Sequence, residues 1–428
     1  MKKYLALILG VLFVLSFAAS AFAIHAEIPS ETQAVVAKGG TQITLGGELR
    51  IRGWYQDNIT SGKNPLSTGS QAFYDERVRL SVDAAVAPGV KGYVMLETNS
   101  TTSDTYTWGN FNSKPTDLNI NEAWILYTGS GLLGFNSGLK IGHMPLALGQ
   151  KEFFDHTKFG DDAIVFFMDP TKQIHIGLLT VKFSENFSGI GNSNLDNTND
   201  LDGYVGLMTY KINDKNTVGI NYTYLNCSDA GFSHQNLGVH ANGSIAGFGY
   251  NAFGDMQFGK SGDGTPTESD FGGYALGLGL SYKLDPVTLR ASAAYGTGDD
   301  DATDNDTDAF TTYLGADQHY TLVYEYRVNS AAGTTATGLN NTTYFNLGVD
   351  YNPTKDLGLS LDGYILQASE DNAAGKDELG WEVDAKIKYA LAKNLSYQID
   401  AGYFDAGDFY GDNAKGATVL RHSLTLSF

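Results

Sequence analysis

The chain has 428 residues, a formal net charge of −20 and a hydrophobic content of 42%. The acidic balance argues against binding to nucleic acid, which needs a basic surface. The single cysteine, Cys227, excludes a disulfide framework and any multi-cysteine metal or haem site, and the hydrophobic content is too high for a disordered chain.

Residues 1–23 have the pattern of a secretory signal peptide. Two lysines precede an apolar run from Leu5 to Phe17, and small residues lead to a cleavage site after Ala23. Residues 24–40 are polar and carry no strand pattern, so we expect a periplasmic lead-in. No later stretch reaches the ~18 apolar residues of a membrane helix, and we therefore expect none. Export without a helical anchor leaves the periplasm, the outer membrane or the medium.

From residue 41 to residue 428, apolar and polar residues alternate in short segments. In the first segment, Leu45, Leu49 and Ile51 alternate with Glu48 and Arg50. Because successive strand side chains point to opposite faces, each segment predicts a strand with one apolar and one polar face. The clear segments are close to the ~9–11 residues that a tilted strand needs to cross a bilayer. They are 43–52, 77–86, 90–97, 117–128, 138–144, 161–168, 173–184, 201–211, 217–227, 271–283, 287–297, 319–328, 342–351, 357–368, 379–390, 395–406 and 418–428.

The connections between these segments alternate in length. Short turns such as Ala87-Pro88-Gly89 and Asp285-Pro286 alternate with long polar loops such as 101–116 and 185–200. Short periplasmic turns and long external loops are the plan of a transmembrane β-barrel. The sequence therefore predicts an all-β, antiparallel, up-and-down barrel over residues 41–428.

The strand number depends on three weaker segments. It must be even if both ends of the barrel lie on the periplasmic side. If 308–314 is a strand, the count is eighteen, which is our prediction. If residues 236–258 also form a hairpin around Asn242-Gly243, the count is twenty. If 308–314 and 236–258 are both loops, the count is sixteen. The third weak segment, 245–258, belongs to that hairpin. A barrel of this size encloses a water-filled channel.

Five arginines are expected to line the channel at mid-height. They fall on the inward register of the first two strands and of the last strand, which must pair with the first. The sequence predicts one basic cluster of Arg50, Arg52, Arg77, Arg79 and Arg421. The inward positions of the late strands are acidic or mixed, with Asp350, Asp362, Glu382, Asp384, Asp400, Lys386 and Lys388.

The connection 145–160, after the fifth predicted strand, is unusually apolar for an external loop. Phe153, Phe154 and Phe159 would be poorly placed in water, so we expect the loop to fold inward and pack. Its charged residues are then candidates for a constriction: Lys151, Glu152, Asp155 and His156.

No pattern in the chain predicts catalysis or a cofactor. The eight histidines show no HExxH or comparable metal-ligand spacing, so we do not expect an enzyme. The acidic run 299–308 could offer oxygen ligands to Ca²⁺ at Asp304, Asp306 and Asp308. We favour a solvated external loop there and predict no metal site.

The chain ends on a strand that stops at a bare aromatic residue. Leu420, Leu424, Leu426 and Phe428 lie on one face, and Arg421 lies on the other. A soluble protein rarely leaves an aromatic residue at a frayed end. The ending resembles the C-terminal signal by which outer-membrane proteins are recognised for assembly, with Leu424, Leu426 and Phe428 as its apolar positions.

These features together resemble the Gram-negative porins. The resemblance implies the cell outer membrane, contact with lipid and lipopolysaccharide, the barrel-assembly machinery, a homotrimer, and passive diffusion of ions and small hydrophilic solutes. It also implies that the loop after the fifth strand narrows the lumen opposite the arginines. The chain lacks the Pro-Glu-Phe-Gly-Gly loop motif of the best-known porins. Two alternatives stay open: an anion- or solute-selective porin using the arginine cluster, and a barrel that sheathes an electron-transfer partner.

Overall fold

The computed structural model describes residues 36–38, 40–59, 69–98, 106–109, 118–130, 133–185, 200–301, 304–314, 319–325, 338–412 and 414–428. Residues Met1–Gln33 and Ala34–Phe428 are two compact units, and every described residue belongs to the second. The predicted signal peptide and most of the lead-in lie outside the described residues. Within the described part, no helix is both long and apolar enough to cross a membrane.

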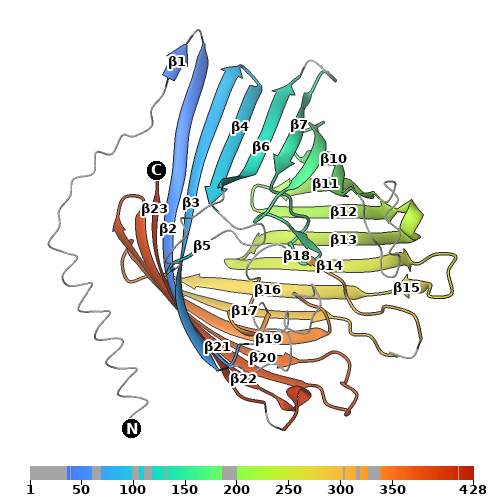
Figure 1. Ribbon diagram of the computed structural model, residues 1–428. Helices are drawn as coiled ribbons and strands as arrows, with labels where there is room; N and C mark the ends of the chain where they lie inside the picture. The colour runs from blue at the N-terminus through green and yellow to red at the C-terminus, as the bar shows by residue number, and fades with distance from the viewer. Residues whose placement is uncertain are drawn as a thin grey trace. The chain divides into compact units, whose positions relative to one another are not determined.

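Eighteen long antiparallel strands form a closed barrel in the described part of the chain (Figure 1). Each strand pairs with its neighbours in sequence, and β2 pairs with both β3 and β23, which closes the ring. The fold class and the strand number are as predicted. The strands are β2 (Thr41–Asp57), β3 (Ser70–Ala87), β4 (Val90–Thr98), β6 (Leu118–Gly129), β7 (Asn136–Met144), β9 (Asp161–Asp169), β10 (Ile174–Ser184), β11 (Leu201–Asn213), β12 (Asn216–Cys227), β13 (Phe232–Ile245), β14 (Phe248–Ser261), β16 (Tyr274–Leu284), β17 (Val287–Gly296), β19 (Thr342–Tyr351), β20 (Leu357–Gln367), β21 (Glu378–Ala392), β22 (Leu395–Ala406) and β23 (Ala417–Ser427).

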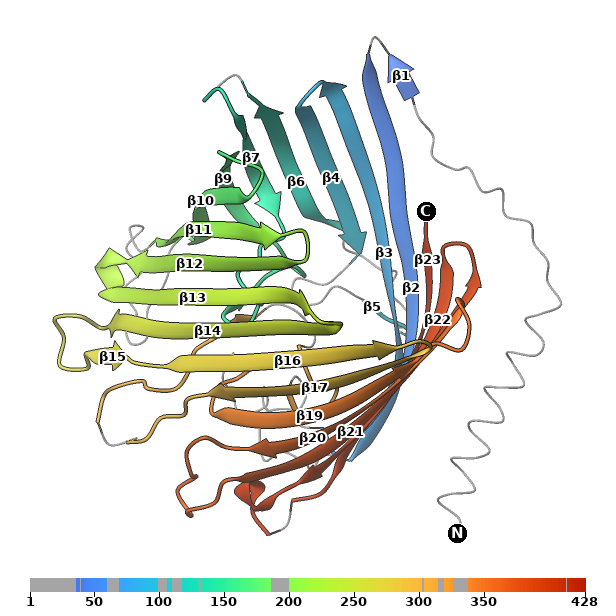
Figure 2. The same cartoon turned by 180° about the vertical axis from the view of Figure 1, so that it is seen from behind.

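Short elements complete the described structure. The strands β1 (Val36–Lys38), β5 (Tyr106–Thr107) and β15 (Ser269–Phe271) extend the wall, while β8 (Phe154–Asp155) and β18 (Tyr313–Leu314) pair with each other. Two 3₁₀ turns, η1 (Ser228–Ala230) and η4 (Asp408–Tyr410), lie in connections between strands. The view from behind shows the neighbouring order of the wall strands from β10 to β17 (Figure 2).

The predicted register of the wall is confirmed. Leu49, Leu80, Val94 and Leu424, assigned to the lipid face, are all among the exposed apolar residues. Their neighbours on the other face point into the barrel, where Arg52 and Arg77 are buried. Since a shift by one residue would exchange the two faces, the period-two pattern specifies the register over the whole wall.

The prediction of which segments supply the eighteen strands was wrong in two places. Residues 232–261 form the hairpin β13–β14, with its turn at Ala246 and Gly247 rather than at Asn242-Gly243. Both turn residues have positive φ, as tight hairpins require. Segment 308–314 and residues 319–325, the described part of the predicted strand 319–328, are not in the wall, so these two errors cancel in the count.

The physical reason lies in the burial pattern. A wall strand needs an outward apolar residue at every second position, but Thr321, Leu322, Val323, Tyr324 and Glu325 are consecutive and all buried. A segment that is covered on every side fits inside the barrel and not in its wall. In β13 the inward positions are small or neutral polar residues, and this weakens the contrast between the two faces.

Candidate functional site: two loops inside the barrel

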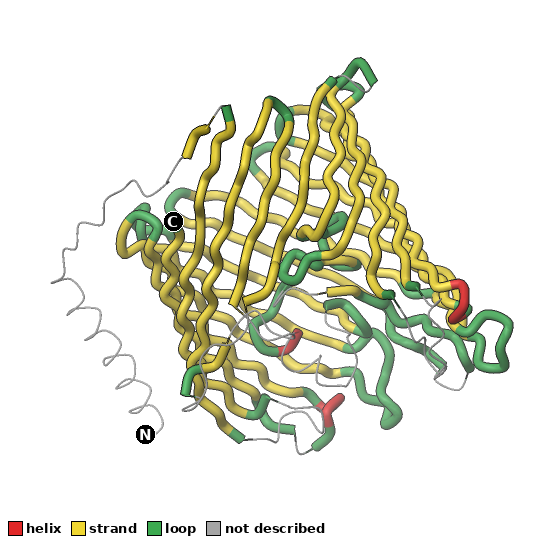
Figure 3. The backbone as a smooth tube through the Cα atoms, turned by 45° about the horizontal axis from the view of Figure 1, so that its top comes forward, coloured by secondary structure: helices red, strands yellow, loops and turns green. Residues whose placement is uncertain are grey.

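Two connections enter the barrel and pair with each other. The 145–160 loop between β7 and β9 carries β8, and the 297–341 connection between β17 and β19 carries β18. Tyr313 pairs with Phe154 and Leu314 with Asp155 in parallel register, and the Tyr313 N–H donates to the Phe153 carbonyl at 2.8 Å. Figure 3 shows the loop segments within the ring of strands. The two loops therefore form one layer across the lumen.

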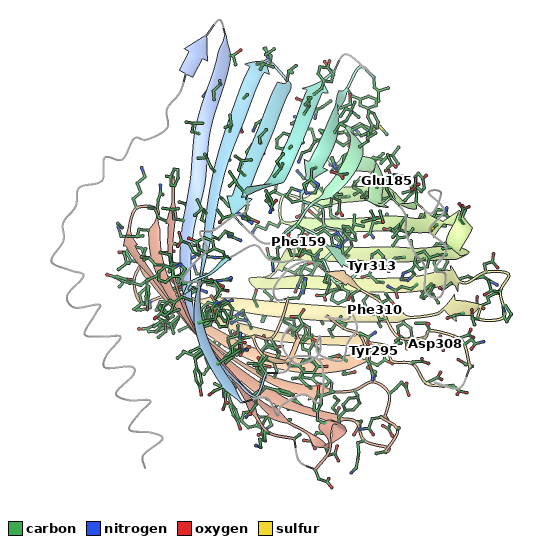
Figure 4. All side chains as sticks on the ribbon, viewed as in Figure 1. Phe159, Glu185, Tyr295, Asp308, Phe310 and Tyr313 are labelled. Carbon is green, nitrogen blue, oxygen red and sulfur yellow. The ribbon has the colours of Figure 1, made fainter. Side chains whose placement is uncertain are left out.

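This layer has an apolar interior. Phe153, Phe154 and Phe310 are 2%, 3% and 0% exposed, and Val323 and Tyr324 are also buried. Figure 4 labels Phe310 and Tyr313, which both lie within the barrel. Burying a phenylalanine contributes about 1.5–3 kcal/mol, so these aromatic residues hold the loops inside. The prediction that the 145–160 loop folds inward and packs agrees with the burial of Phe153 and Phe154, but Phe159, on which it also rested, is 38% exposed.

Carboxylates of β21 hold the second loop against the wall. The backbone N–H groups of Val323 and Tyr324 donate to the Glu382 carboxylate at 2.7 and 2.8 Å. The Leu322 N–H donates to Asp384 Oδ2 at 2.9 Å. Hydrogen bonds to a carboxylate are roughly twice as strong as those between neutral groups, so segment 321–325 is firmly anchored.

Polar side chains of β13 and β14 hold another part of the same loop. Gln257 of β14 both donates to and accepts from Thr311, at 2.6 and 2.8 Å. His234 of β13 is 2.9 Å from the Tyr313 hydroxyl. The 297–341 connection is thus attached to wall strands at two places.

His319 joins the two loops electrostatically. Its Nδ1 lies 2.6 Å from Glu325 Oε1, and its Nε2 lies 3.5 Å from Asp155 Oδ2. Burial lowers the pKa of His319, but the carboxylates of Asp155 and Glu325 outweigh burial and raise it to about 10. Burial raises the pKa of Asp155, yet His319 and the hydrogen bonds from Thr157 hold it below its ordinary value. The raised pKa favours the imidazolium form of His319, which lies between the two carboxylates.

Below this layer, towards the short turns, lies a polar cavity of about 710 Å³. In it, Arg290 donates to both Asp350 and Asp362 through four hydrogen bonds of 2.8–3.0 Å. Both loops contribute to the lining, through Glu152 and His319. The other charged lining residues are Asp384, Lys386 and Asp400, and the aromatic ones are Phe253, Tyr320, Tyr344 and Tyr364.

The five predicted arginines are brought to adjacent strands, but ion pairs neutralise most of their positive charge. Four of them are paired with carboxylates: Arg52 with Asp75, Arg77 with Glu48, Arg79 with Glu97, and Arg421 with Asp400. Arg50 lies opposite Arg77. The acidic partners lie on the same inward face as the arginines. This pairing avoids the cost of burying a guanidinium without a carboxylate. The partners could have been predicted from the same period-two pattern.

An aromatic ring separates two of these arginines. The guanidinium carbons of Arg52 and Arg421 lie 4.9 and 5.0 Å from the centre of the Trp54 ring. The indole N–H donates to Asp75 at 2.9 Å. Cation–π attraction thus adds to the ion pairs across the seam where β2 meets β23.

The four candidate constriction residues have different surroundings. Glu152 lines the cavity, and burial raises its pKa to about 8. Lys151 is exposed and lies 3.5 Å from Asp155. Asp155 is buried against Thr157 and His319, and His156 contacts Asp161 at 2.9 Å. Of the four, only Glu152 is among the cavity-lining residues.

The weak calcium candidate of the acidic run is not supported. In the described residues, no three carboxylate, imidazole or thiol groups come close enough to hold a metal ion. Asp304 and Asp306 instead accept backbone N–H groups of Asp306 and Asp270, respectively, as turn residues commonly do.

The last residue closes the barrel. Phe428 and Gly47 exchange two backbone hydrogen bonds, of 2.7 and 3.0 Å. A Cβ on Gly47 would lie 2.6 Å from the Phe428 ring, so the glycine makes room for it. The role of Leu424, Leu426 and Phe428 as an assembly signal stays a prediction.

The fold and the inward loops define an outer-membrane β-barrel of eighteen antiparallel strands. Similar solved structures are OpdO of Pseudomonas aeruginosa (TM-score 0.58, 14% identity, covering 90% of this chain and 97% of that one) and OccK8 (OprE) of the same organism (0.58, 11%, 90% and 98%). A variant of OccD1 (OprD) has a TM-score of 0.57 at 12% identity, covering 90% and 96%.

The family model described as alginate export matches residues 202–421. The chain belongs to the alginate export family. A search of curated protein sequences finds no match.

Proposed function

We propose that the protein is a passive outer-membrane channel for ions and small hydrophilic solutes. The observation that carries this proposal is the layer formed by the two inward loops, next to a polar cavity of about 710 Å³. A cavity of this volume suits a small solute, since ligand pockets commonly measure ~300–1,000 Å³. Charged and amide side chains line it and would replace the water of a polar solute.

The family description suggests an anionic polysaccharide as a second candidate cargo. A polyanion would need unpaired cations along its path, by analogy with phosphate chains. In the described lumen, the arginines at the β2–β3–β23 seam are largely ion-paired, and the cavity lining holds more carboxylates than basic groups. These charges favour small solutes over a polyanion. They also argue against a channel that selects anions by means of the arginine cluster. An electron-transfer sheath would need an open lumen, and the loop layer argues against it.

Swelling of proteoliposomes in neutral sugars of increasing size tests this function. We expect swelling with monosaccharides and none with oligomers too long to pass the loop layer. Alginate oligomers should give no swelling. Swelling with alginate oligomers that exceeds the swelling with neutral oligomers of equal length would contradict the proposal and favour the polysaccharide cargo.

The surroundings and assembly state are also proposals. We infer that the apolar outer face contacts lipid and lipopolysaccharide, that the barrel-assembly machinery inserts the chain, and that it forms a homotrimer as porins commonly do. Cross-linking in native membranes, followed by denaturing electrophoresis, distinguishes a trimer from a monomer.

A further inference from the structure

Three buried oxygen atoms without hydrogen-bond partners lie beneath the 145–160 loop. Asn221, Thr223 and Asn236 are 3%, 1% and 0% exposed. Asn221 Oδ1, Thr223 Oγ1 and Asn236 Oδ1 have no hydrogen-bond partner among the described residues. A buried polar group left in this state costs about 1–3 kcal/mol, so three together indicate a bound species that supplies their partner.

These oxygens share one region of the inner wall. Thr223 of β12 lies directly opposite Asn236 of β13, and Asn221 lies opposite Gly238. A Cβ built on Gly238 would be 2.6 Å from Asp255 Oδ1 and 2.8 Å from both Nδ2 and Oδ1 of Asn221. The Asn221 amide and the Asp255 carboxylate therefore lie beside the same glycine.

Two further contacts enclose this region. Asn236 Nδ2 donates to Asp255 Oδ1 at 2.8 Å, which leaves its Oδ1 as the group without a partner. The tip of the loop covers the wall, because a Cβ on Gly149 would lie 3.3 Å from Asn221 Oδ1.

Two carboxylates, one on the loop and one on β14, act on each other electrostatically and lack a cationic partner among the described lysines and arginines. Neither Glu152 of the loop nor Asp255 of β14 forms an ion pair with a described lysine or arginine, and Glu152 Oε2 is buried without a hydrogen bond. Burial raises the pKa of Glu152 to about 8, and the negative charge of Asp255 acts in the same direction. His319 is the cationic group that acts on Glu152, but Asp155 and Glu325 already bind it.

We propose that a calcium ion binds between the loop tip and the β12–β14 wall, held by Glu152, Asp255 and the side-chain oxygens of Asn221 and Asn236, with Thr223 at the edge. Carboxylates and amide oxygens are the ligands that Ca²⁺ takes in sites of six to eight oxygens. Zinc and copper favour imidazole and thiolate ligands, and the proposed set holds neither. This site goes beyond the proposed channel function and would fix the loop tip to the wall.

Calorimetric titration of the full-length protein tests the site. The protein is treated with a chelator in detergent and then titrated with CaCl₂. We expect saturable binding of one ion and a higher unfolding temperature. The double variant Glu152→Gln, Asp255→Asn should lose both effects, and the matched variant Asp304→Asn, Asp306→Asn in the external loop should retain them. Absence of binding by the wild type, or loss of binding in the external-loop variant alone, would overturn the proposal.

A second measurement does not depend on a variant that folds. Anomalous scattering from crystals of the wild-type protein grown with CaCl₂ should show a peak between Glu152 and Asp255. Water molecules alone at this place, with no anomalous peak, would show that solvent satisfies the buried oxygens and would refute the calcium site.

Discussion

The imidazole Nε2 of His319 lies 3.5 Å from the Asp155 carboxylate, and this contact joins the two loops that meet inside the barrel. Each residue comes from a different loop, and each has a second anchor. Glu325 accepts the Nδ1–H of His319 and the backbone N–H groups of His319 and Tyr320, while Asp155 accepts the Thr157 hydroxyl. The contact between the two loops therefore involves the charge of one histidine.

The contact of His319 with Asp155 and Glu325 should weaken only at strongly alkaline pH. The pKa of His319 is raised from 6.5 to about 10, so its stabilising contribution is fully present below pH ~6.5 and is lost as the pH rises through about 10. We expect faster hydrogen exchange at the His319 and Tyr320 amides above pH ~10, after correction for intrinsic rates. His319→Gln should show fast exchange at all pH values. Equal protection in the variant and the wild type at neutral pH would disprove the contribution of His319.

A charged side chain should lower the free energy of unfolding when it is placed on the lipid face, but not when it is placed in the lumen. Leu80→Arg places a guanidinium among lipid chains and should cost about 2–4 kcal/mol if residue 80 lies near the bilayer midplane. Ser81→Arg, one residue further, places the same group in the lumen and should be tolerated. Denaturant unfolding in liposomes measures both changes. A larger loss for Ser81→Arg than for Leu80→Arg would reverse the assigned register.

Removing the terminal aromatic residue should impair assembly. Phe428 pairs with Gly47 at the seam, and its deletion removes both backbone bonds and the ring packed on the glycine. We expect a lower outer-membrane yield and less heat-modifiable protein on gels for the deletion and for Phe428→Asp. Phe428→Tyr keeps the ring and serves as the control. Normal yield from the deletion variant would exclude the predicted assembly signal.

The preference of the channel for cations or anions should depend on the arginines together with their carboxylate partners, and not on the arginines alone. Replacing the five arginines with Gln leaves their carboxylate partners uncompensated, so the reversal potential in a planar bilayer should shift towards cations. Neutralising the partners as well should largely restore the original value. An unchanged reversal potential in the folded arginine variant would place the cluster away from the permeation path. The first variant changes Arg50, Arg52, Arg77, Arg79 and Arg421, and the second adds Glu48→Gln, Asp75→Asn, Glu97→Gln and Asp400→Asn.

The sequence was sufficient for most of the wall strands, for the two faces of the wall and for one of the two inward loops. The alternation around Leu49 and Leu80 specifies the faces, and Phe153 and Phe154 reveal a loop that must be buried. The hairpin β13–β14 was underrated because Asn236, Gly238 and other inward residues lower the contrast between its faces.

The second inward loop was mistaken for strands, and the reason is physical. Residues 319–325 carry apolar and polar side chains at intervals that resemble a strand, but the carboxylates that anchor them are on β21, far away in sequence. Glu382 and Asp384 were recognised as inward acidic residues, yet their partners are backbone N–H groups, which leave no trace in the side-chain pattern. The pairing of β8 with β18 is likewise made by the backbone.

The most direct test of the channel is single-channel conductance of the purified wild-type protein in a planar bilayer. It is compared with a variant in which residues 150–154, at the tip of the first loop, are replaced by a short Gly-Ser linker. We expect discrete conductance steps for the wild type and severalfold larger steps for the variant, because the variant removes part of the loop layer that crosses the lumen. Absence of conductance from folded wild-type protein, or equal conductance in both, would contradict a passive channel constricted by these loops.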